Sequence, residues 1–150
     1  MQLSKHFTLA EFTRSESAKR HGVSNEPTPE HLENIKVLCE KVLEPLREHF
    51  GHPINISSGY RSKLLNHYIG GTLKSQHLEG RAVDLDLDGT PYGTTNKMLF
   101  DYILKNLDFD QVINEHNYSW VHVSYSTIKN RKQALDASKS NGRTVYSLHK

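Results

Sequence analysis

Apolar residues in the first third of the chain recur at the three- and four-residue spacing of amphipathic helices. The clearest series follows Thr28, which we expect to cap the helix, and its apolar members are Leu32, Ile35, Cys39, Val42 and Leu46. Pro45 lies inside this series. Because proline lacks an N–H donor and clashes with the preceding turn, we expect a kink or break there. A shorter helix with a capping box at its start is predicted over residues 8–21.

Further along the chain, apolar and polar residues alternate with the period of two that is typical of half-buried strands. The clearest case is Val83, Asp84, Leu85, Asp86, Leu87 and Asp88. Other strands are predicted over residues 54–57, 109–114 and 120–125, and a turn at 115–118 joins the last two. Short helices are predicted after Ser62 and after Thr94 or Thr95. This order favours an α+β fold, a compact single domain in which helices flank an antiparallel sheet.

The segment after Ser126 shows neither the helical spacing of three to four residues nor the strand alternation of two. It is polar and basic, and its cations are Lys129, Arg131, Lys132, Lys139 and Arg143. We expect a weak helix or a solvated tail in such a segment. The sequence therefore predicts a folded domain over residues 1–131 and a basic C-terminal tail over residues 132–150.

Composition excludes several classes of protein. The 150 residues suffice for one domain with its own core, and no apolar run is long enough for membrane insertion. The first residues lack the apolar stretch of a signal peptide. A net charge of +2 is too small to indicate nucleic-acid binding, although it does not oppose an anionic partner such as cell wall. The single Cys39 excludes an internal disulfide, and its place on an apolar helix face predicts a buried, inert thiol.

Two residues of the metal-ligand type, His77 and Asp84, lie seven positions apart on either side of a glycine turn. Since Asp84 lies on the polar face of its predicted strand, we interpret the pair as two ligands of a divalent metal. His122 offers a third, because it shares the polar face of its strand with Trp120. Three protein ligands and one open position are what a hydrolytic zinc site requires. On the pattern alone, an ordinary hydrogen-bonded strand histidine stays an alternative.

Two other kinds of site are excluded. Alternate aspartates followed by Gly89 resemble the start of an EF-hand calcium loop, but its twelfth position is Thr95 instead of a bidentate glutamate. Asp86 and Asp88 are therefore expected to be strand-end and turn residues. The segment around Ser58 lacks the flanking pattern of a nucleophile elbow, which argues against serine catalysis.

One set of positions in this chain forms a longer motif: Ser75, His77, Gly80, Ala82 and Asp84, and then Trp120 and His122. The set resembles the zinc D-alanyl-D-alanine carboxypeptidases and dipeptidases, a metallopeptidase family related to the lysostaphin-type peptidases and the hedgehog signalling domain. The resemblance extends from about Leu3 to Arg131. It implies a compact α+β fold and one Zn²⁺ per chain, held on an antiparallel sheet by His77, Asp84 and His122.

A zinc peptidase also needs a base that takes a proton from water and gives it to the leaving amine. Glu115 is the best candidate, because it ends one predicted strand just before the turn into the strand of His122. An exposed turn glutamate is the alternative. In the dipeptidase branch of the family the acidic residue lies closer to the last ligand, whereas Glu115 lies seven positions before His122. Trp120 stands where some relatives carry another histidine.

Three further residues are candidates for substrate binding. Arg61 follows a glycine turn, and its fixed donors could hold a carboxylate or polarise the scissile carbonyl, a role that the resemblance supports. An ordinary surface arginine is the alternative. By the same resemblance, Ser75 is expected to donate a hydrogen bond to the substrate. Trp120 either lines the substrate cleft or simply packs.

The resemblance implies a murein peptidase that cuts peptidoglycan stem peptides, as a D-Ala-D-Ala carboxypeptidase or an L-Ala-D-Glu endopeptidase. The alternatives are a catalytically inactive, zinc-containing module that binds cell wall and a structural component of a virion. We expect a monomer whose partners are peptidoglycan peptides. Without a signal peptide, such an enzyme would be made in the cytoplasm and reach the cell wall after release, as phage endolysins do, or as part of a virion.

Overall fold

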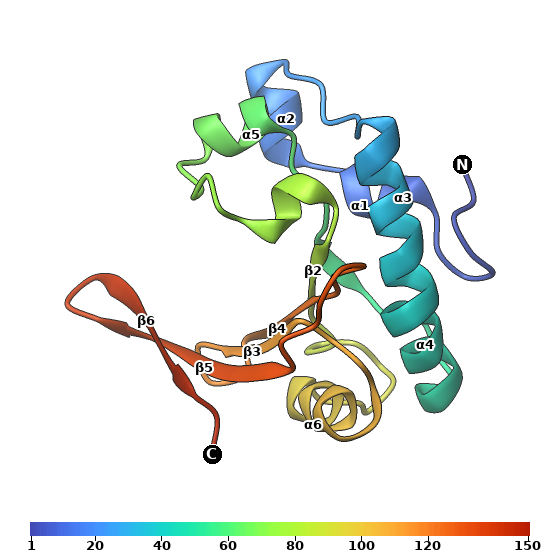
Figure 1. The fold of residues 1–150 in the computed structure, drawn as a ribbon, viewed down its shortest axis with the longest axis vertical. Helices are drawn as coiled ribbons and strands as arrows, with labels where there is room; N and C mark the ends of the chain where they lie inside the picture. Colours follow the sequence, from blue (N-terminus) through green and yellow to red (C-terminus); the bar gives the residue numbers. More distant parts are fainter.

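The computed structural model describes residues 1–150 and arranges short helices around one six-stranded sheet (Figure 1). The helices are α1 (Leu9–Thr13), α2 (Glu16–His21), α3 (Pro29–Leu38), the π-helical turn η1 (Cys39–Leu43), α4 (Glu44–Phe50), α5 (Lys63–Tyr68), the 3₁₀ helix η2 (Gln76–Glu79) and α6 (Asn96–Asn106). The strands are β1 (Ile56–Ser58), β2 (Ala82–Leu85), β3 (Gln111–Glu115), β4 (Trp120–Ser124), β5 (Gln133–Ser140) and β6 (Arg143–Leu148). No helix is both long and apolar enough to cross a bilayer.

The predicted N-terminal helix is in fact two short helices, α1 and α2. Between them Arg14 takes an extended conformation with φ −63° and ψ 134°. Ser15 then caps α2, and its hydroxyl accepts a hydrogen bond from the N–H of Ala18 at 3.1 Å. Because this cap satisfies a free N–H of a new first turn, it favours a second helix start over continuation. The predicted capping box at Thr8 is present, with Glu11 Oε1 accepting from the Thr8 N–H at 2.9 Å.

The long predicted helix keeps its path but changes its hydrogen bonding halfway. In η1 the N–H of Glu44 donates to the carbonyl oxygen of Cys39, which is a π-helical bond. This turn directly precedes Pro45, whose missing N–H cannot join the regular ladder. The expected disturbance by the proline is present as a π-helical turn, but the helix continues through α4 and is not broken. Cys39 is fully buried, and burial raises the pKa of its thiol to about 12, so the prediction of an inert thiol is confirmed.

The strands follow the order β1-β2-β4-β3-β5-β6. All neighbouring strands are antiparallel apart from β3 and β5, which run parallel. The α+β prediction is confirmed, and β1 to β4 form the antiparallel sheet that the alternation predicted. In Figure 1 the α3–α4 helix runs along the right of the sheet, α6 lies below it, and the β5–β6 hairpin extends to the left.

The two faces of the sheet have different surroundings. One face packs with α3, α4 and α6 in a core of 21 buried residues, to which the sheet contributes Ile56, Val83, Leu85, Val112, Val121 and Val123. Successive side chains of a strand point to opposite faces. The alternate residues Asp84, Glu115 and His122 therefore lie on the other face, away from the main core. The core thus builds a rigid support behind the polar face.

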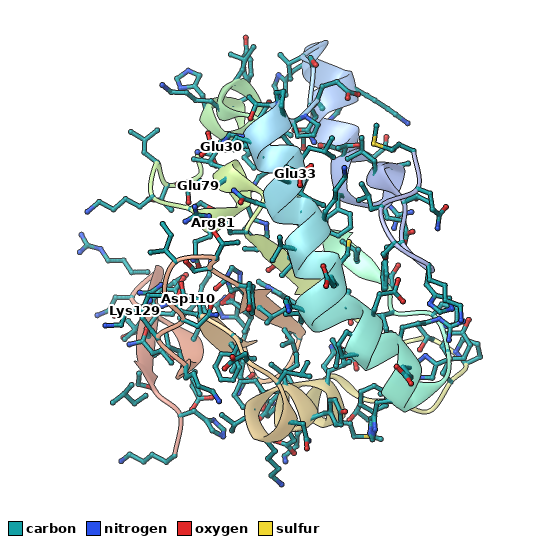
Figure 2. All side chains as sticks on the ribbon, turned by 45° about the vertical axis from the view of Figure 1, so that its right-hand side comes forward. Glu30, Glu33, Glu79, Arg81, Asp110 and Lys129 are labelled. Atoms are coloured by element: carbon teal, nitrogen blue, oxygen red, sulfur yellow. The ribbon has the colours of Figure 1, made fainter.

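The prediction of a weak helix or solvated tail is wrong for residues 133–148, which form the β5–β6 hairpin. The loop before β5 is fixed by Arg131, whose Nε and Nη2 each donate to Asp110 at 2.8 Å. Figure 2 labels Asp110 and, in the same loop as Arg131, Lys129. After β6, His149 Nδ1 lies 3.0 Å from Asp136 Oδ1. The local pattern missed β6 because that strand is exposed along its whole length. The boundary of the peptidase domain at residue 131 stays a prediction.

Candidate metal centre

Three side chains of the metal-ligand type meet on the polar face of the sheet. Asp84 Oδ1 lies 3.1 Å from His122 Nδ1 and 3.4 Å from His77 Nε2. One ligand atom from each residue lies within 4.8 Å of the others, and the imidazole ring centroids are 5.2 Å apart. The structure therefore brings together the three residues that the sequence predicts as ligands.

Strand pairing places two of the three. Asp84 on β2 and His122 on β4 are directly paired across the antiparallel ladder. Opposite residues of such a pair share a face and have Cβ atoms about 4.5–5.5 Å apart. The carboxylate and the imidazole therefore meet as a consequence of register alone.

His77 reaches the same point from the short helix η2. Ser75 caps this helix, with its Oγ accepting from the His77 N–H at 3.2 Å, and Gly80 ends it with a φ of 73°. A Cβ at Gly80 would lie 2.5 Å from the carbonyl oxygen of His31 in α3. Glycine is required here both by the left-handed backbone and by the close approach of the helix.

A hydrogen bond to the main chain sets which nitrogen of His77 faces the cluster. Nδ1 lies 2.7 Å from the carbonyl oxygen of Gly59, which can only accept, so Nδ1 carries the proton. The lone pair of Nε2 then faces Asp84 Oδ1 at 3.4 Å. Two acceptors at this distance repel one another unless a cation or a proton lies between them. Metal-binding histidines are commonly oriented by such a second hydrogen bond.

The carboxylate of Asp84 is held in its ionised form. Burial by itself would raise the pKa of Asp84, but the hydrogen bond from His122, and the charge of His77 whenever a proton lies on its Nε2, hold that pKa well below its usual range. An ionised carboxylate is the form that binds a metal.

The donor set fits a zinc ion. Two imidazole nitrogens and one carboxylate oxygen are ordinary zinc ligands, and tetrahedral bonds of 2.0–2.2 Å separate ligand atoms by about 3.3–3.6 Å. Of the separations from Asp84 Oδ1, 3.4 Å lies in this range and 3.1 Å lies just below it. All three residues also line a cleft, which leaves one side of the cluster accessible as a catalytic zinc site requires.

The cleft has a volume of about 420 Å³. All seven residues that the sequence singled out line it: Arg61, Ser75, His77, Asp84, Glu115, Trp120 and His122. The other lining residues are Thr72, Lys74, Gln76, Gln111, Ile113, Arg131, Leu135 and Tyr146. A volume of this size suits a small ligand or a short stretch of peptide.

Glu115 lies at the end of β3, directly paired with Trp120 of β4. The turn that follows places three consecutive residues in the left-handed region, with φ between 49° and 62°. Burial raises the pKa of Glu115; the nearby His122 opposes this shift and the negative charge of Asp84 adds to it. A buried carboxyl with a raised pKa can take up and return a proton closer to neutral pH. The exposed-turn alternative does not hold, since Glu115 is only 8% exposed.

Arg61 and Ser75 are linked to one another and to His77. Arg61 Nη2 donates to Ser75 Oγ at 3.1 Å, and the main-chain N–H of Arg61 donates to the carbonyl oxygen of His77 at 3.2 Å. The Nε of Arg61 is buried and has no hydrogen-bond partner. Burial lowers the pKa of Arg61, while Asp84 raises it. A guanidinium with an unused buried donor is suited to a carboxylate or carbonyl group entering the cleft.

Trp120 does both things that the sequence left open. Its indole lines the cleft, and its ring also packs on His116, with centroids 5.3 Å apart. The indole Nε1 is buried beside the carboxyl of Glu115, the residue paired with Trp120, and its N–H lowers the pKa of that carboxyl. The indole therefore favours the ionised form of the candidate base.

Four of the lining residues that sequence reasoning missed come from strands and are of two kinds. Gln111 and Ile113 occupy the same face of β3 as Glu115, so the alternation over residues 109–114 could have found them. Leu135 and Tyr146 come from the segment predicted as a tail, in which no local signal marks them.

The match to known families covers most of the chain. A family model described as Peptidase M15 matches residues 5–124, the part that contains the ligand cluster and Glu115. The chain belongs to the peptidase M15 family. The resemblance inferred from the sequence is thereby confirmed, and membership of the M15 family implies a zinc-dependent metallopeptidase. A search of the curated proteins finds no match. The M15 match ends before β5, so the C-terminal hairpin lies outside it.

Proposed function

We propose that this M15 protein is a murein peptidase that hydrolyses peptide bonds in peptidoglycan stem peptides. The observation that carries the proposal is the cluster of His77, Asp84 and His122 in a cleft that also holds the buried carboxyl of Glu115. The three residues would hold one Zn²⁺ per chain.

Each residue of the cluster and its neighbours has a defined task in this proposal. When bound, zinc supplies Lewis-acid polarisation of the scissile carbonyl and lowers the pKa of water to about 7. Glu115 takes the proton from the attacking water and returns it to the leaving amine, and its raised pKa suits both transfers. The hydrogen bond from His77 Nδ1 to the carbonyl of Gly59 keeps Nε2 directed at the cluster.

The loop side of the cleft would bind the anionic part of the substrate. Arg61 and Lys74 line this side of the cleft and add positive charge to it. Ser75, which follows Lys74 in the chain and precedes His77 by two residues, adds a hydroxyl group. Stem peptides carry carboxylates, which a guanidinium binds through two parallel hydrogen bonds. Arg61 is therefore proposed to hold a substrate carboxylate, and Ser75 to donate a further hydrogen bond. Such binding fits both D-Ala-D-Ala and L-Ala-D-Glu cleavage.

Digestion of purified murein by the zinc-loaded protein, followed by mass spectrometry, tests the proposal. We expect released peptides whose new termini identify the cleaved bond. Glu115→Gln is the matched control, because it keeps the size of the side chain and all three ligands but removes the base. It should retain one zinc per chain and release peptides about 10²–10⁴-fold more slowly. Intact murein after incubation with fully zinc-loaded wild-type protein would contradict the proposal and favour a binding module.

A further inference from the structure

The C-terminal hairpin supplies one wall of the cleft that holds the metal cluster. Leu135 from β5 and Tyr146 from β6 both line it. The hairpin lies beyond residue 124, where the family match ends, so the match does not cover this wall of the cleft.

Strand register aligns the hairpin with the catalytic candidates. One row of directly paired residues crosses four strands: Asp84, His122, Ile113 and Leu135. The adjacent row consists of Trp120, Glu115, Ala137 and Tyr146. Directly paired residues share a face of the sheet. The first row therefore joins the metal cluster to the hairpin, and the second row joins the proposed base, Glu115, to the hairpin.

The hairpin end of these rows is apolar. Ile113, Leu135 and Ala137 form a small buried cluster separate from the main core, with exposed fractions of 6%, 9% and 3%. Tyr146, which is 54% exposed, pairs with Ala137 from the outer strand. Because Ala137 carries only a methyl group, no bulky side chain separates the tyrosine ring from Glu115. Burial raises the pKa of Tyr146, and the charges of Glu115 and Asp84 raise it further, which agrees with a phenol that leans toward the cleft.

The opposite end of the cleft is cationic. Arg61 follows β1, at the far edge of the sheet from β6, and the His-Asp-His cluster lies on β2, β4 and η2 between these edges. Arg131 also lines the cleft from the loop before β5, but its guanidinium is paired with Asp110. A bound peptide thus meets the positive charge of Arg61 on one side of the cluster and mainly apolar surface on the other. This asymmetry distinguishes the two sides of a scissile bond.

We propose that the hairpin forms an aliphatic subsite beside the metal centre, with Ile113 and Leu135 as its floor and Tyr146 as its wall. The subsite takes the alkyl side chain of the substrate residue next to the scissile bond, while the carboxylate of the substrate lies toward Arg61. This inference rests on the proposed peptidase function, and it adds Tyr146 as a residue that determines specificity. One methyl group in such a pocket changes kcat/KM by about 10-fold or more.

The test uses synthetic L-Ala-D-Glu-L-Lys-D-Ala-D-Ala and analogues in which glycine replaces the alanine on one side of the cleaved bond. The measured quantity is the ratio of kcat/KM for the alanine peptide to that for the glycine peptide. We expect the zinc-loaded wild-type protein to prefer alanine about 10-fold. Tyr146→Ala should lower this ratio at least threefold. Tyr146→Phe keeps the ring and should keep the ratio, as should Val145→Ala, which alters the neighbouring exposed side chain on the other face of β6.

An unchanged ratio in Tyr146→Ala would overturn the proposal. So would a Tyr146→Phe variant that behaves like Tyr146→Ala, because the hydroxyl and not the apolar wall would then be responsible. If the wild-type protein cleaves neither peptide, the proposed peptidase function fails. The subsite is then judged from dissociation constants of the same peptides measured by calorimetry, where equal affinity for the alanine and glycine peptides would overturn it.

Discussion

Among individual residues, the most demanding arrangement is the meeting of an acceptor nitrogen of His77 with the ionised carboxylate of Asp84. Their separation of 3.4 Å is unfavourable without a positive charge between them. The main-chain hydrogen bond at Gly59 and the burial of His77 prevent the ring from turning away. The local structure is thus arranged for a cation before any cation binds.

Replacement of one ligand should therefore remove the metal. We expect His122→Ala to reduce bound zinc from about one ion per chain to a small fraction and to abolish peptide release, since two ligands hold zinc poorly. Metal analysis by mass spectrometry after gel filtration measures the zinc content. His116→Ala is the matched control, because His116 lies in the adjacent turn and outside the cluster. Full zinc content in His122→Ala would refute the ligand assignment.

Asp110 is a second residue that links segments far apart in the sequence. It accepts hydrogen bonds from Arg131 Nε and Nη2 at 2.8 Å and from Gln76 Nε2 at 2.7 Å. It therefore ties the loop before β5 to the residue that precedes His77. The hydrogen bonds from Arg131 hold the pKa of Asp110 at about 2.

This low pKa gives a pH dependence with a defined sign. The unfolded value is about 3.9, so the stabilisation by Asp110 is complete above about pH 4 and is lost as the pH falls toward 2. Asp110→Asn should lower the free energy of unfolding at pH 7 by about 2 kcal/mol and reduce the difference between pH 7 and pH 2.5. Urea unfolding at both pH values measures this. An unchanged pH dependence in the variant would mean that other carboxylates dominate.

At the level of elements, the short helix η2 is the part whose position matters most for the site. It carries His77, and its end at Gly80 packs against α3, where His31 O and Ile35 Cγ1 leave no room for a Cβ. The helix is thus locked between its serine cap and a glycine contact. Its position decides whether the third ligand reaches the two that strand pairing supplies.

Gly80→Ala should therefore damage both stability and metal binding. We expect a loss of about 2–4 kcal/mol, from the left-handed backbone and the clash together, and a weaker zinc affinity because η2 must shift. Gly89→Ala is a matched control: its φ of 78° is equally left-handed, but nothing lies within 4 Å of the added Cβ. That variant should lose only about 1–2 kcal/mol and keep its zinc affinity. Urea unfolding and zinc titration measure the two effects, and equal losses would contradict the role of the α3 contact.

For the molecule as a whole, the core and the metal centre occupy opposite faces of one sheet. The 21-residue core lies between the sheet and the helices and contains none of the ligands. Folding therefore does not depend on the metal in the way that it does for small zinc modules. The metal should add stability to a structure that already exists.

Zinc removal should lower the melting temperature without unfolding the protein. A free zinc concentration 100 times the dissociation constant adds about 2.7 kcal/mol. For a chain of 150 residues this corresponds to a rise of about 5–10 °C in Tm. Calorimetry with and without a chelator measures the shift. If the protein shows no cooperative unfolding transition after zinc is removed with a chelator, the conclusion that the core folds without the metal is contradicted.

Local features of the sequence determined most of the elements and indicated the proposed site residues. Alternation placed Asp84 and His122 on polar strand faces, Ser62 and Thr28 began their helices as predicted, and the helix that contains Pro45 changes to π-helical bonding just before it. These signals act over a few residues, because capping, backbone preference and side-chain period depend only on near neighbours. The family resemblance rested on the same local spacing.

Only the tertiary structure decided what surrounds the site. The parallel pairing of β5 with β3 brings Leu135 beside Ile113, and β6 brings Tyr146 to the row of Glu115. Nothing local announces these contacts, because β6 is exposed throughout and shows no buried face. Its place is fixed by hydrogen bonds to β5, and residues such as Arg131 and His149 fix the chain on either side of the hairpin. The sequence by itself indicated the proposed ligands, and long-range pairing determined the walls of the cleft around them.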